Sequence, residues 1–325
     1  MNGLNMLFAI AFPLISLIVS ATTGSHINSA NLRTTRGTPA ATPGLRTQVL
    51  FDDFSYLNQR QLKRHGWIVR TKPGWPGIPG AIWSEDGVRI VKDPDRPSNR
   101  LLRMTSSTEG PDARTTQTQI CHQRKYFEGT YAARVRFSDA PITGPAGDQI
   151  VESFYTIAPL KAPMDPDYSE LDYEYLPNGG WGIAGPTFYA TTWYTFSPEP
   201  NWKKDNVFQT LPGTQAGWHS LVTQVMGGKV RYFVDGKLFV EHSDKYYPRD
   251  TMSINFNLWF IRGGMTQSSE ARKYQEDIDW VFFQANTALT PEQVESTVAT
   301  LRRKRIPFRD TVPSKAPALA SPCNF

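Results

Sequence analysis

Short runs in which apolar and polar residues alternate recur along the chain from Val49 onward, separated by Gly, Pro, Asn and Asp. Successive side chains of a β-strand point to opposite faces, so a two-residue period predicts strands. The runs are VLFDDF, WIVRT, VRIVKD, LLRMTSS, TYAARVRF, QIVESFYTI, ELDYEYL, TFYATTWYTF, WHSLVTQVM, KVRYFVDGKLFVEH, SINFNLWFI and DIDWVFF. About a dozen strands at this spacing predict one all-β domain over residues 48–286, either a sandwich or a barrel.

The pattern also predicts which face of a strand is buried. In the run TYAARVRF, Tyr131, Ala133, Val135 and Phe137 share one face, whereas Arg134 and Arg136 point to the other. Between the runs KVRYFV and KLFVEH, the pair Asp235-Gly236 predicts a two-residue hairpin turn.

One segment of the chain carries the signals of a helix. Thr290 is a suitable N-cap, Pro291 suits the first helical position, and Gln293 stands where a capping box needs a Glu or Gln. Residues 287–325 are therefore expected to form a short C-terminal helix, packed on the sandwich, and a tail.

The N-terminal segment differs from the rest of the chain. The apolar run from Met6 to Val19 ends in a small-x-small pattern at Ala21, which predicts a signal peptide over residues 1–21. A membrane anchor is the alternative, but the run is shorter than the roughly 20 residues that span a bilayer. Residues 22–47, rich in Thr, Ser, Pro and Gly, are expected to be a flexible leader. A secreted protein that no longer associates with membranes is predicted.

The net charge of +5 does not indicate a nucleic-acid partner, because the excess basic residues lie near the two ends. Residues 1–46 carry three arginines and no acid, and residues 291–325 carry six basic and three acidic residues. The remaining residues 47–290 therefore have a net charge of −1. A nucleic-acid partner is not expected, since its binding needs basic residues gathered on a folded face. The protein is expected to be a monomer.

The chain has two cysteines, Cys121 and Cys323. In an oxidising compartment they could pair and tie the C-terminal tail to the body, and two unpaired thiols are the alternative. No Cys/His cluster with zinc-ligand spacing is present.

The segment YSELDYEYLPNGG, residues 168–180, contains the most informative pattern. On a strand, Glu170, Asp172 and Glu174 form a row on one face, while Leu171 and Tyr173 point to the other. Three neighbouring carboxylates repel one another, by roughly 3 kcal/mol for a pair about 6 Å apart at an effective dielectric near 20. This repulsion favours a protonated state for at least one of them. A solvated strand face is the plain alternative.

Glycoside hydrolysis uses such a row. It needs an ionised carboxylate near the anomeric carbon and a protonated carboxyl near the leaving oxygen, about 5–5.5 Å apart in retaining enzymes. Residues four apart on a strand have Cα atoms about 13 Å apart, and two glutamates that lean together close most of that gap.

The sequence resembles glycoside hydrolase family 16, the laminarinase- and lichenase-like enzymes. SELDYEYL resembles the Glu-x-Asp-x-Glu signature of the family, and YFEGTYAARVRF, GWHSLVTQVMGGKVRYFVDGKLF, INFNLWF and DIDWVFF resemble further family strands in the same order. The resemblance covers most of residues 48–284. It implies a concanavalin A-like jelly roll, that is, an antiparallel sandwich of two β-sheets.

The resemblance also implies roles for the carboxylate row. Glu170 is the expected nucleophile, Asp172 its orienting partner and Glu174 the general acid/base of a retaining endo-glycosidase. The implied substrate is a β-linked polysaccharide, such as a β-1,3- or β-1,3-1,4-glucan. A glycan-binding protein without turnover and a transglycosylase are the alternatives on the same fold.

Further residues are candidates for the cleft because polysaccharides bind to aromatic faces and to amide and hydroxyl groups. The substrate-binding candidates are Tyr155, Tyr168, Trp181, Trp193, His219, Asn255, Asn257 and Trp259. Asp279 lies in a segment that resembles the calcium-bearing strand of many family members, so it is a candidate ligand of a structural calcium ion. The chemistry itself requires no cofactor.

Overall fold

The computed structural model describes residues 47–110 and 114–323, and these residues form seventeen β-strands, two α-helices and two short 3-10 helices. The helices are α1 (Arg60–Arg64), α2 (Pro291–Arg303), η1 (Glu85–Gly87) and η2 (Asp244–Tyr246). The strands are β1 (Val49–Asp52), β2 (Trp67–Val69), β3 (Ile82–Trp83), β4 (Val88–Lys92), β5 (Arg100–Thr108), β6 (Thr115–His122), β7 (Gly129–Phe137), β8 (Ile150–Ile157), β9 (Glu170–Leu176), β10 (Thr187–Ser197), β11 (Lys203–Pro212), β12 (Gly217–Met226), β13 (Lys229–Val234), β14 (Lys237–Ser243), β15 (Ser253–Phe260), β16 (Arg272–Ala285) and β17 (Phe308–Asp310).

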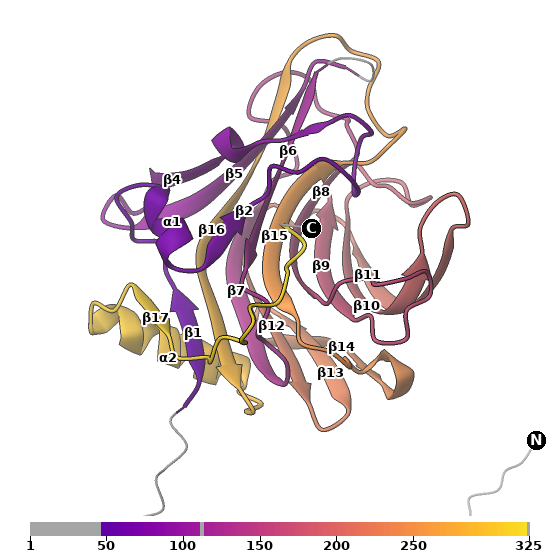
Figure 1. Ribbon diagram of the computed structural model, residues 1–325. Helices are drawn as coiled ribbons and strands as arrows, with labels where there is room; N and C mark the ends of the chain where they lie inside the picture. The colour runs from indigo at the N-terminus through magenta and orange to yellow at the C-terminus, as the bar shows by residue number, and fades with distance from the viewer. Residues whose placement is uncertain (1–46, 111–113, 324–325) are drawn as a thin grey trace, which may run out of the picture. The chain divides into compact units, whose positions relative to one another are not determined.

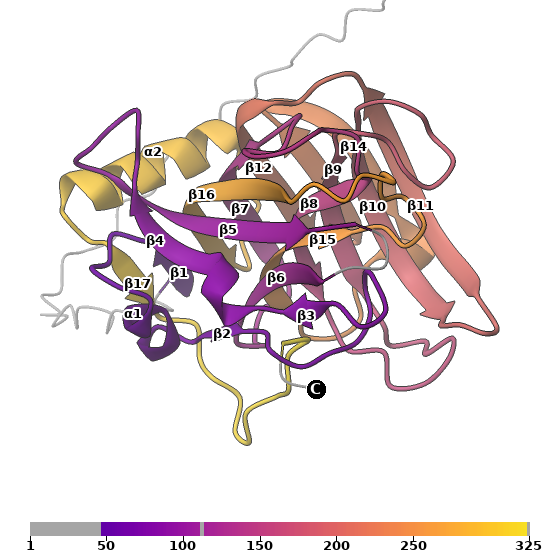
Figure 2. The ribbon, with the colours of Figure 1, turned by 90° about the horizontal axis from the view of Figure 1, so that it is seen from above.

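The strands build two layers in which all pairs are antiparallel except the short parallel pair β3–β6, which confirms the predicted sandwich (Figures 1 and 2). The front sheet has the order β11-β10-β9-β8-β15-β6-β2. The back sheet runs β14-β13-β12-β7-β16, and β16 continues to β5 and β4 along one half and to β1 and β17 along the other. At one edge β6 also pairs with β5, and this pairing joins the two sheets.

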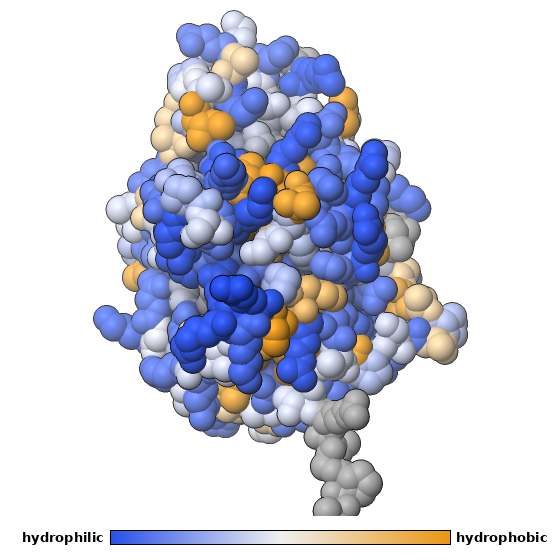
Figure 3. Space-filling model, turned by 90° about the vertical axis from the view of Figure 1, so that its left-hand side faces the viewer, coloured by the Kyte–Doolittle hydropathy of each residue, from blue (hydrophilic) through white to orange (hydrophobic). Residues whose placement is uncertain are grey.

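The apolar core lies between the sheets, as the alternation predicts. The apolar face of β7 is fully buried there, whereas Arg134 and Arg136 on its other face are partly exposed. Helix α2 buries Val294, Val298 and Leu301 against the outer face of the back sheet. The side of the molecule that carries α2 is mainly hydrophilic, with its apolar residues in small separate groups (Figure 3).

The structure confirms the predicted hairpin turn and the predicted N-terminal cap of the C-terminal helix. Asp235 and Gly236 connect β13 to β14 with φ angles of 49° and 81°, the left-handed conformation that a tight hairpin turn requires. Thr290 and Gln293 form the reciprocal capping box at the start of α2.

Two long strands were not among the predicted runs, β6 and β11. Both are rich in Thr, Gln, Asn and Lys, so their alternation of apolar and polar residues is weak. Their place in the sheet comes from pairing with neighbours that are far away in sequence, such as β6 with β15.

The predicted signal peptide and nearly all of the predicted leader lie outside the described residues. Across residues 47–110 and 114–323, no helix combines the length and the apolar character that crossing a bilayer requires.

Candidate active site

The carboxylate row stands on β9, near the middle of the front sheet, between β8 and β10. Asp172 has Tyr155 on β8 and Thr191 on β10 as its register partners. On the opposite face of β9, Leu171, Tyr173 and Tyr175 are buried in the core between the sheets. Burial of this apolar face sets the register, because a shift by one residue would turn the acids into the core.

All three acids line one cleft with a volume of about 290 Å³ on the outer face of the front sheet. Asp172 is 3% exposed, whereas Glu170 and Glu174 are partly exposed. The lining residues are Arg70, Pro73, Gly74, Trp75, Pro76, Gln119, Ser153, Tyr155, Ile157, Pro159, Leu160, Tyr168, Glu170, Asp172, Glu174, Phe196, Asn257, Trp259 and Pro322. Glu170 and Glu174 therefore open into one shared space.

Neighbouring side chains hold the acids in distinct environments. The Tyr168 hydroxyl donates a hydrogen bond to the Glu170 carboxylate. The indole Nε1 of Trp193 donates to Oδ2 of Asp172 at 2.9 Å. The two donors come from a residue two positions before β9 and from β10, so Glu170 and Asp172 are positioned by different parts of the chain.

Burial in this cleft favours the protonated form of the acids. It raises the pKa of Glu170 to about 7, although the hydrogen bonds with Tyr168 and Asp172 act in the opposite direction. The pKa of Glu174 rises to about 8, through burial first and the charge of Glu170 second. The pKa of Asp172 lies well above its usual value because of burial and the charges of Glu170 and Glu174. Near neutral pH, the row therefore holds both ionised and protonated carboxyl groups.

Four of the predicted binding residues line the cleft, namely Tyr155, Tyr168, Asn257 and Trp259. Tyr155 accepts a hydrogen bond at its hydroxyl from Gln119 Nε2 at 2.5 Å. Asn257 accepts one from the Ser153 hydroxyl at 2.5 Å. These bonds fix the polar groups that the cleft presents to a ligand.

Two predicted tryptophans border the cleft. Trp181 is 48% exposed, and its ring centroid lies 5.3 Å from that of Tyr189 and 6.4 Å from that of Trp259. Trp193, through its bond to Asp172, flanks the carboxylate row. Both therefore offer aromatic surface next to the lining residues.

Three other predictions need correction. Tyr168 lines the cleft but is fully buried, so it positions Glu170 rather than presenting its ring for stacking on a sugar. Asn255 is also fully buried, and its amide donates to the main-chain oxygens of Tyr155 and Ser253.

His219 is not in the cleft at all. It belongs to β12 in the back sheet, where its ring nitrogens contact Asp235 Oδ2 at 2.8 Å and the Gln215 carbonyl at 2.9 Å. Alternation assigns a residue to one face of its strand, but it cannot tell which of the two sheets contains that strand.

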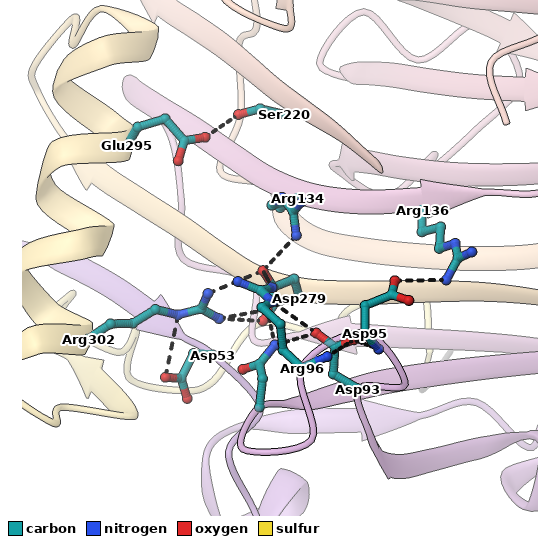
Figure 4. Close-up of polar contacts among 11 residues, drawn as sticks. Asp53, Asp93, Asp95, Arg96, Arg134, Arg136, Ser220, Asp279, Glu295 and Arg302 are labelled. Atoms are coloured by element: carbon teal, nitrogen blue, oxygen red, sulfur yellow. Dashed lines mark hydrogen bonds and ion pairs between the residues drawn. The ribbon is translucent and has the colours of Figure 1, made fainter. Parts of the chain in front are cut away.

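Asp279, the candidate calcium ligand, has cationic side chains around it (Figure 4). Its carboxylate oxygens accept hydrogen bonds from Arg96 and Arg134 at 3.0 Å each and from Arg302 at 2.8 Å. Asn99 donates to the same carboxylate at 2.7 Å. Among the described residues, no group of three or more His, Cys, Asp or Glu side chains is arranged to hold a metal ion. Guanidinium groups thus stand where calcium was expected, and the calcium prediction has no support here.

Several lining residues were not predicted from the sequence. Arg70 and Gln119 contact each other through a 2.7 Å hydrogen bond from Nη1 to Oε1, although they are 49 residues apart. Phe196 lies at the end of β10, with its ring centroid 5.2 Å from that of Tyr168. A pattern in the sequence could have indicated Gln119. Residues at every second position of a strand share a face, and Gln117, Gln119 and Cys121 form such a row on β6.

The structure resembles solved glycoside hydrolases. A glycoside hydrolase family 16 endo-glucanase from Bacteroides ovatus aligns with a TM-score of 0.55 and 16% identity, over 71% of this chain and 98% of that one. A β-glucanase from Bacillus licheniformis aligns with a TM-score of 0.51 and 15% identity, over 73% and 97%. A galactose-4-sulfate-3,6-anhydro-galactose galactohydrolase aligns with a TM-score of 0.52 and 15% identity, over 77% and 98%.

These likenesses confirm that the fold is the predicted jelly-roll sandwich. No family model matches the sequence, and no curated protein does either.

Proposed function

We propose that the protein is a retaining endo-glycosidase that hydrolyses a β-linked polysaccharide, a glucan with β-1,3 or mixed β-1,3-1,4 linkages. The observation that carries the proposal is the row of Glu170, Asp172 and Glu174 inside one cleft. The fold supports it, because solved structures of the same fold include an endo-glucanase, a β-glucanase and a galactohydrolase.

The electrostatics of the row support distinct roles for the two glutamates. Glu170 has the lower pKa of the two and accepts the Tyr168 hydrogen bond, so it is the carboxylate more readily ionised. Glu174, with a pKa of about 8, keeps its proton at neutral pH. A nucleophile must be ionised and a general acid protonated, which assigns these roles to Glu170 and Glu174 respectively.

The reaction follows in two displacements. Glu174 gives its proton to the leaving oxygen while Glu170 attacks the anomeric carbon, and the sugar–oxygen bond breaks. Glu174 then removes a proton from a water molecule, which attacks the glycosyl ester and releases Glu170. Asp172 is placed to orient Glu170, since the two side chains share a hydrogen bond. No metal ion or cofactor is needed for these steps.

Secretion is part of the proposal. It rests on the N-terminal apolar segment and is supported by the disulfide bond between Cys121 and Cys323, because disulfides persist in oxidising compartments. A protease-protection and fractionation experiment on the full chain, with the mature N-terminus sequenced, tests this part.

The catalytic test uses two substitutions and a matched control. Glu170→Gln and Glu174→Gln are each expected to lower kcat by about 10²–10⁴-fold, because each removes one of the two reacting groups. Asp167→Asn changes an exposed acid just before the row and should leave kcat unchanged. The measurement is release of reducing ends, together with product lengths, across a panel of β-glucans and galactans.

The outcomes separate the rival functions. Wild-type activity in both glutamine variants contradicts the proposal. Binding of oligosaccharides without products indicates a glycan-binding protein, and products longer than the starting oligosaccharides indicate a transglycosylase.

A further inference from the structure

The C-terminal segment that follows β17 crosses the front of the molecule and ends beside the front sheet (Figure 1). At its start, the Lys125 ammonium donates to the Val312 carbonyl at 2.9 Å. Residues 313–318 are then exposed, whereas Ser321 and Cys323 are buried again. The middle of the segment therefore adds little to the core, and its end is held at a defined place.

The disulfide bond determines that place. Cys323 is bonded to Cys121 of β6, which lies 202 residues earlier in the chain. Cys121 shares a face of β6 with Gln119, and the Gln119 amide lies 3.5 Å from the Cys121 sulfur. Since Gln119 lines the cleft and donates to Tyr155, the disulfide lies on the cleft side of the front sheet.

One residue of the segment reaches the cleft itself. Pro322, the neighbour of Cys323, lines it together with Arg70 and Gln119. Arg70 is fixed by its bonds to Gln119 at 2.7 Å and to the Trp75 carbonyl at 3.0 Å, and its guanidinium stacks 4.1 Å above the ring centre of Trp83. Pro322, Gln119 and Arg70 are called here the tail wall of the cleft.

We propose that the C-terminal segment is a specificity-determining part of the binding cleft, and that the Cys121–Cys323 disulfide holds it against the substrate. The inference rests on the proposed polysaccharide hydrolysis. The partly exposed ring of Pro322 offers an apolar surface to the cleft, whereas Gln119 and Arg70 are 1% and 6% exposed and hold that side of the cleft through their own contacts. A sugar unit presents a matching surface in the C–H groups on its faces. The tail wall therefore binds a sugar unit of the polymer away from the bond that is cleaved.

The test separates contact with the sugar from stability of the fold. Pro322→Gly removes the ring and keeps the disulfide, whereas a Cys121→Ser/Cys323→Ser double variant frees the tail end. Pro313→Gly makes the same change at an exposed tail position outside the cleft, so it is the matched control. KM and kcat are measured on the accepted polysaccharide and on a short aryl β-glycoside of the same sugar, and melting temperatures are recorded in parallel.

The expected result is a KM for the polysaccharide that rises about five-fold in the Pro322→Gly and double-serine variants, the size expected for losing one small apolar contact. In these two variants, kcat for the polysaccharide should match the wild-type value. KM and kcat for the short glycoside should also match the wild-type values. The Pro313→Gly control should have wild-type KM and kcat on both substrates. A reductant added to the wild type should reproduce the double-serine result, because the chain has only these two cysteines.

Unchanged KM in the Pro322→Gly and double-serine variants of an active enzyme would overturn this inference and leave the proposed function intact, even if the melting temperature falls. If the wild type binds oligosaccharides without cleaving them, the proposed hydrolysis fails, and the same comparison is made on the dissociation constants. A wild type that neither binds nor cleaves any glycan overturns both proposals.

Discussion

Glu170 and Glu174 are chemically identical residues on the same face of one strand, and their surroundings make them different. Burial raises the pKa of both, but Glu170 accepts a hydrogen bond from Tyr168, which stabilises its ionised form. The charge of Glu170 in turn helps Glu174 to keep its proton. The division of roles is therefore a property of the neighbours of the row and not of the acids alone.

Tyr168→Phe tests this division. Loss of the hydroxyl raises the pKa of Glu170, so the acidic limb of the kcat/KM profile moves to higher pH. A hydrogen bond to a charged group contributes about 1.5–3 kcal/mol, so we expect kcat/KM at pH 6 to fall about ten-fold more than at pH 8. Tyr247→Phe also removes a tyrosine–glutamate hydrogen bond, but its partner Glu128 is not in the cleft, so its profile should be unchanged. Equal losses at both pH values in Tyr168→Phe would mean that Tyr168 acts only on packing.

At the scale of elements, Asp279 ties two strands of the back sheet to helix α2 and to the loop after β4. It belongs to β16 and receives Arg134 from β7, Arg302 from α2 and Arg96 from the loop after β4 (Figure 4). Burial alone would raise its pKa, but Arg302, Asn99 and Arg96 together lower it to about 2. The helix thus has a polar attachment in addition to its apolar contacts.

The lowered pKa predicts a loss of stability in acid. In the unfolded chain Asp279 titrates near 3.8, so its contribution is fully present above about pH 4 and disappears as the pH falls towards about 2. Asp279→Asn should lower the free energy of unfolding at pH 7 by about 2–3 kcal/mol and have a much smaller effect near pH 2. Urea unfolding at both pH values measures this. EDTA should leave the melting temperature of the wild type unchanged, and a clear decrease would indicate a bound metal ion instead.

At the scale of the whole molecule, two buried acids lie in the interior of the sandwich. Glu152 of β8 and Glu276 of β16 come from opposite sheets, and both are fully buried. Burial, followed by the charge of Glu152, raises the pKa of Glu276 well above its usual value. The main-chain N–H of Ser138 donates to Glu152 at 3.0 Å. The two sheets therefore pack best when at least one of the acids is protonated.

This pair predicts that the fold weakens as the pH rises. Because the folded pKa of Glu276 is above its unfolded value of 4.5, the associated stability is present at low pH and is lost as the pH rises through the folded pKa. Glu276→Gln keeps the shape without the charge, and should raise the free energy of unfolding at pH 8 by about 1–3 kcal/mol with little effect at pH 5. The exposed Glu109→Gln serves as control. A glutamine variant that is destabilised equally at both pH values would contradict the prediction.

The sequence by itself determined the properties that depend on neighbouring residues. A period of two places Glu170, Asp172 and Glu174 on one face of a strand and Leu171 and Tyr173 on the other, whatever the rest of the chain does. The Asp235-Gly236 turn and the Thr290–Gln293 cap are equally local, and the structure contains both.

Only the tertiary structure decided which residues from distant segments meet. Cys121 pairs with Cys323, Arg70 with Gln119, and Asp279 with arginines of three other segments, and no local pattern encodes these contacts. His219 and Asn255 were misplaced for the same reason, since alternation gives a face but neither the sheet nor the depth of burial. Those properties follow from the packing of the two sheets, whose energy is a sum over contacts between residues that are often more than a hundred positions apart.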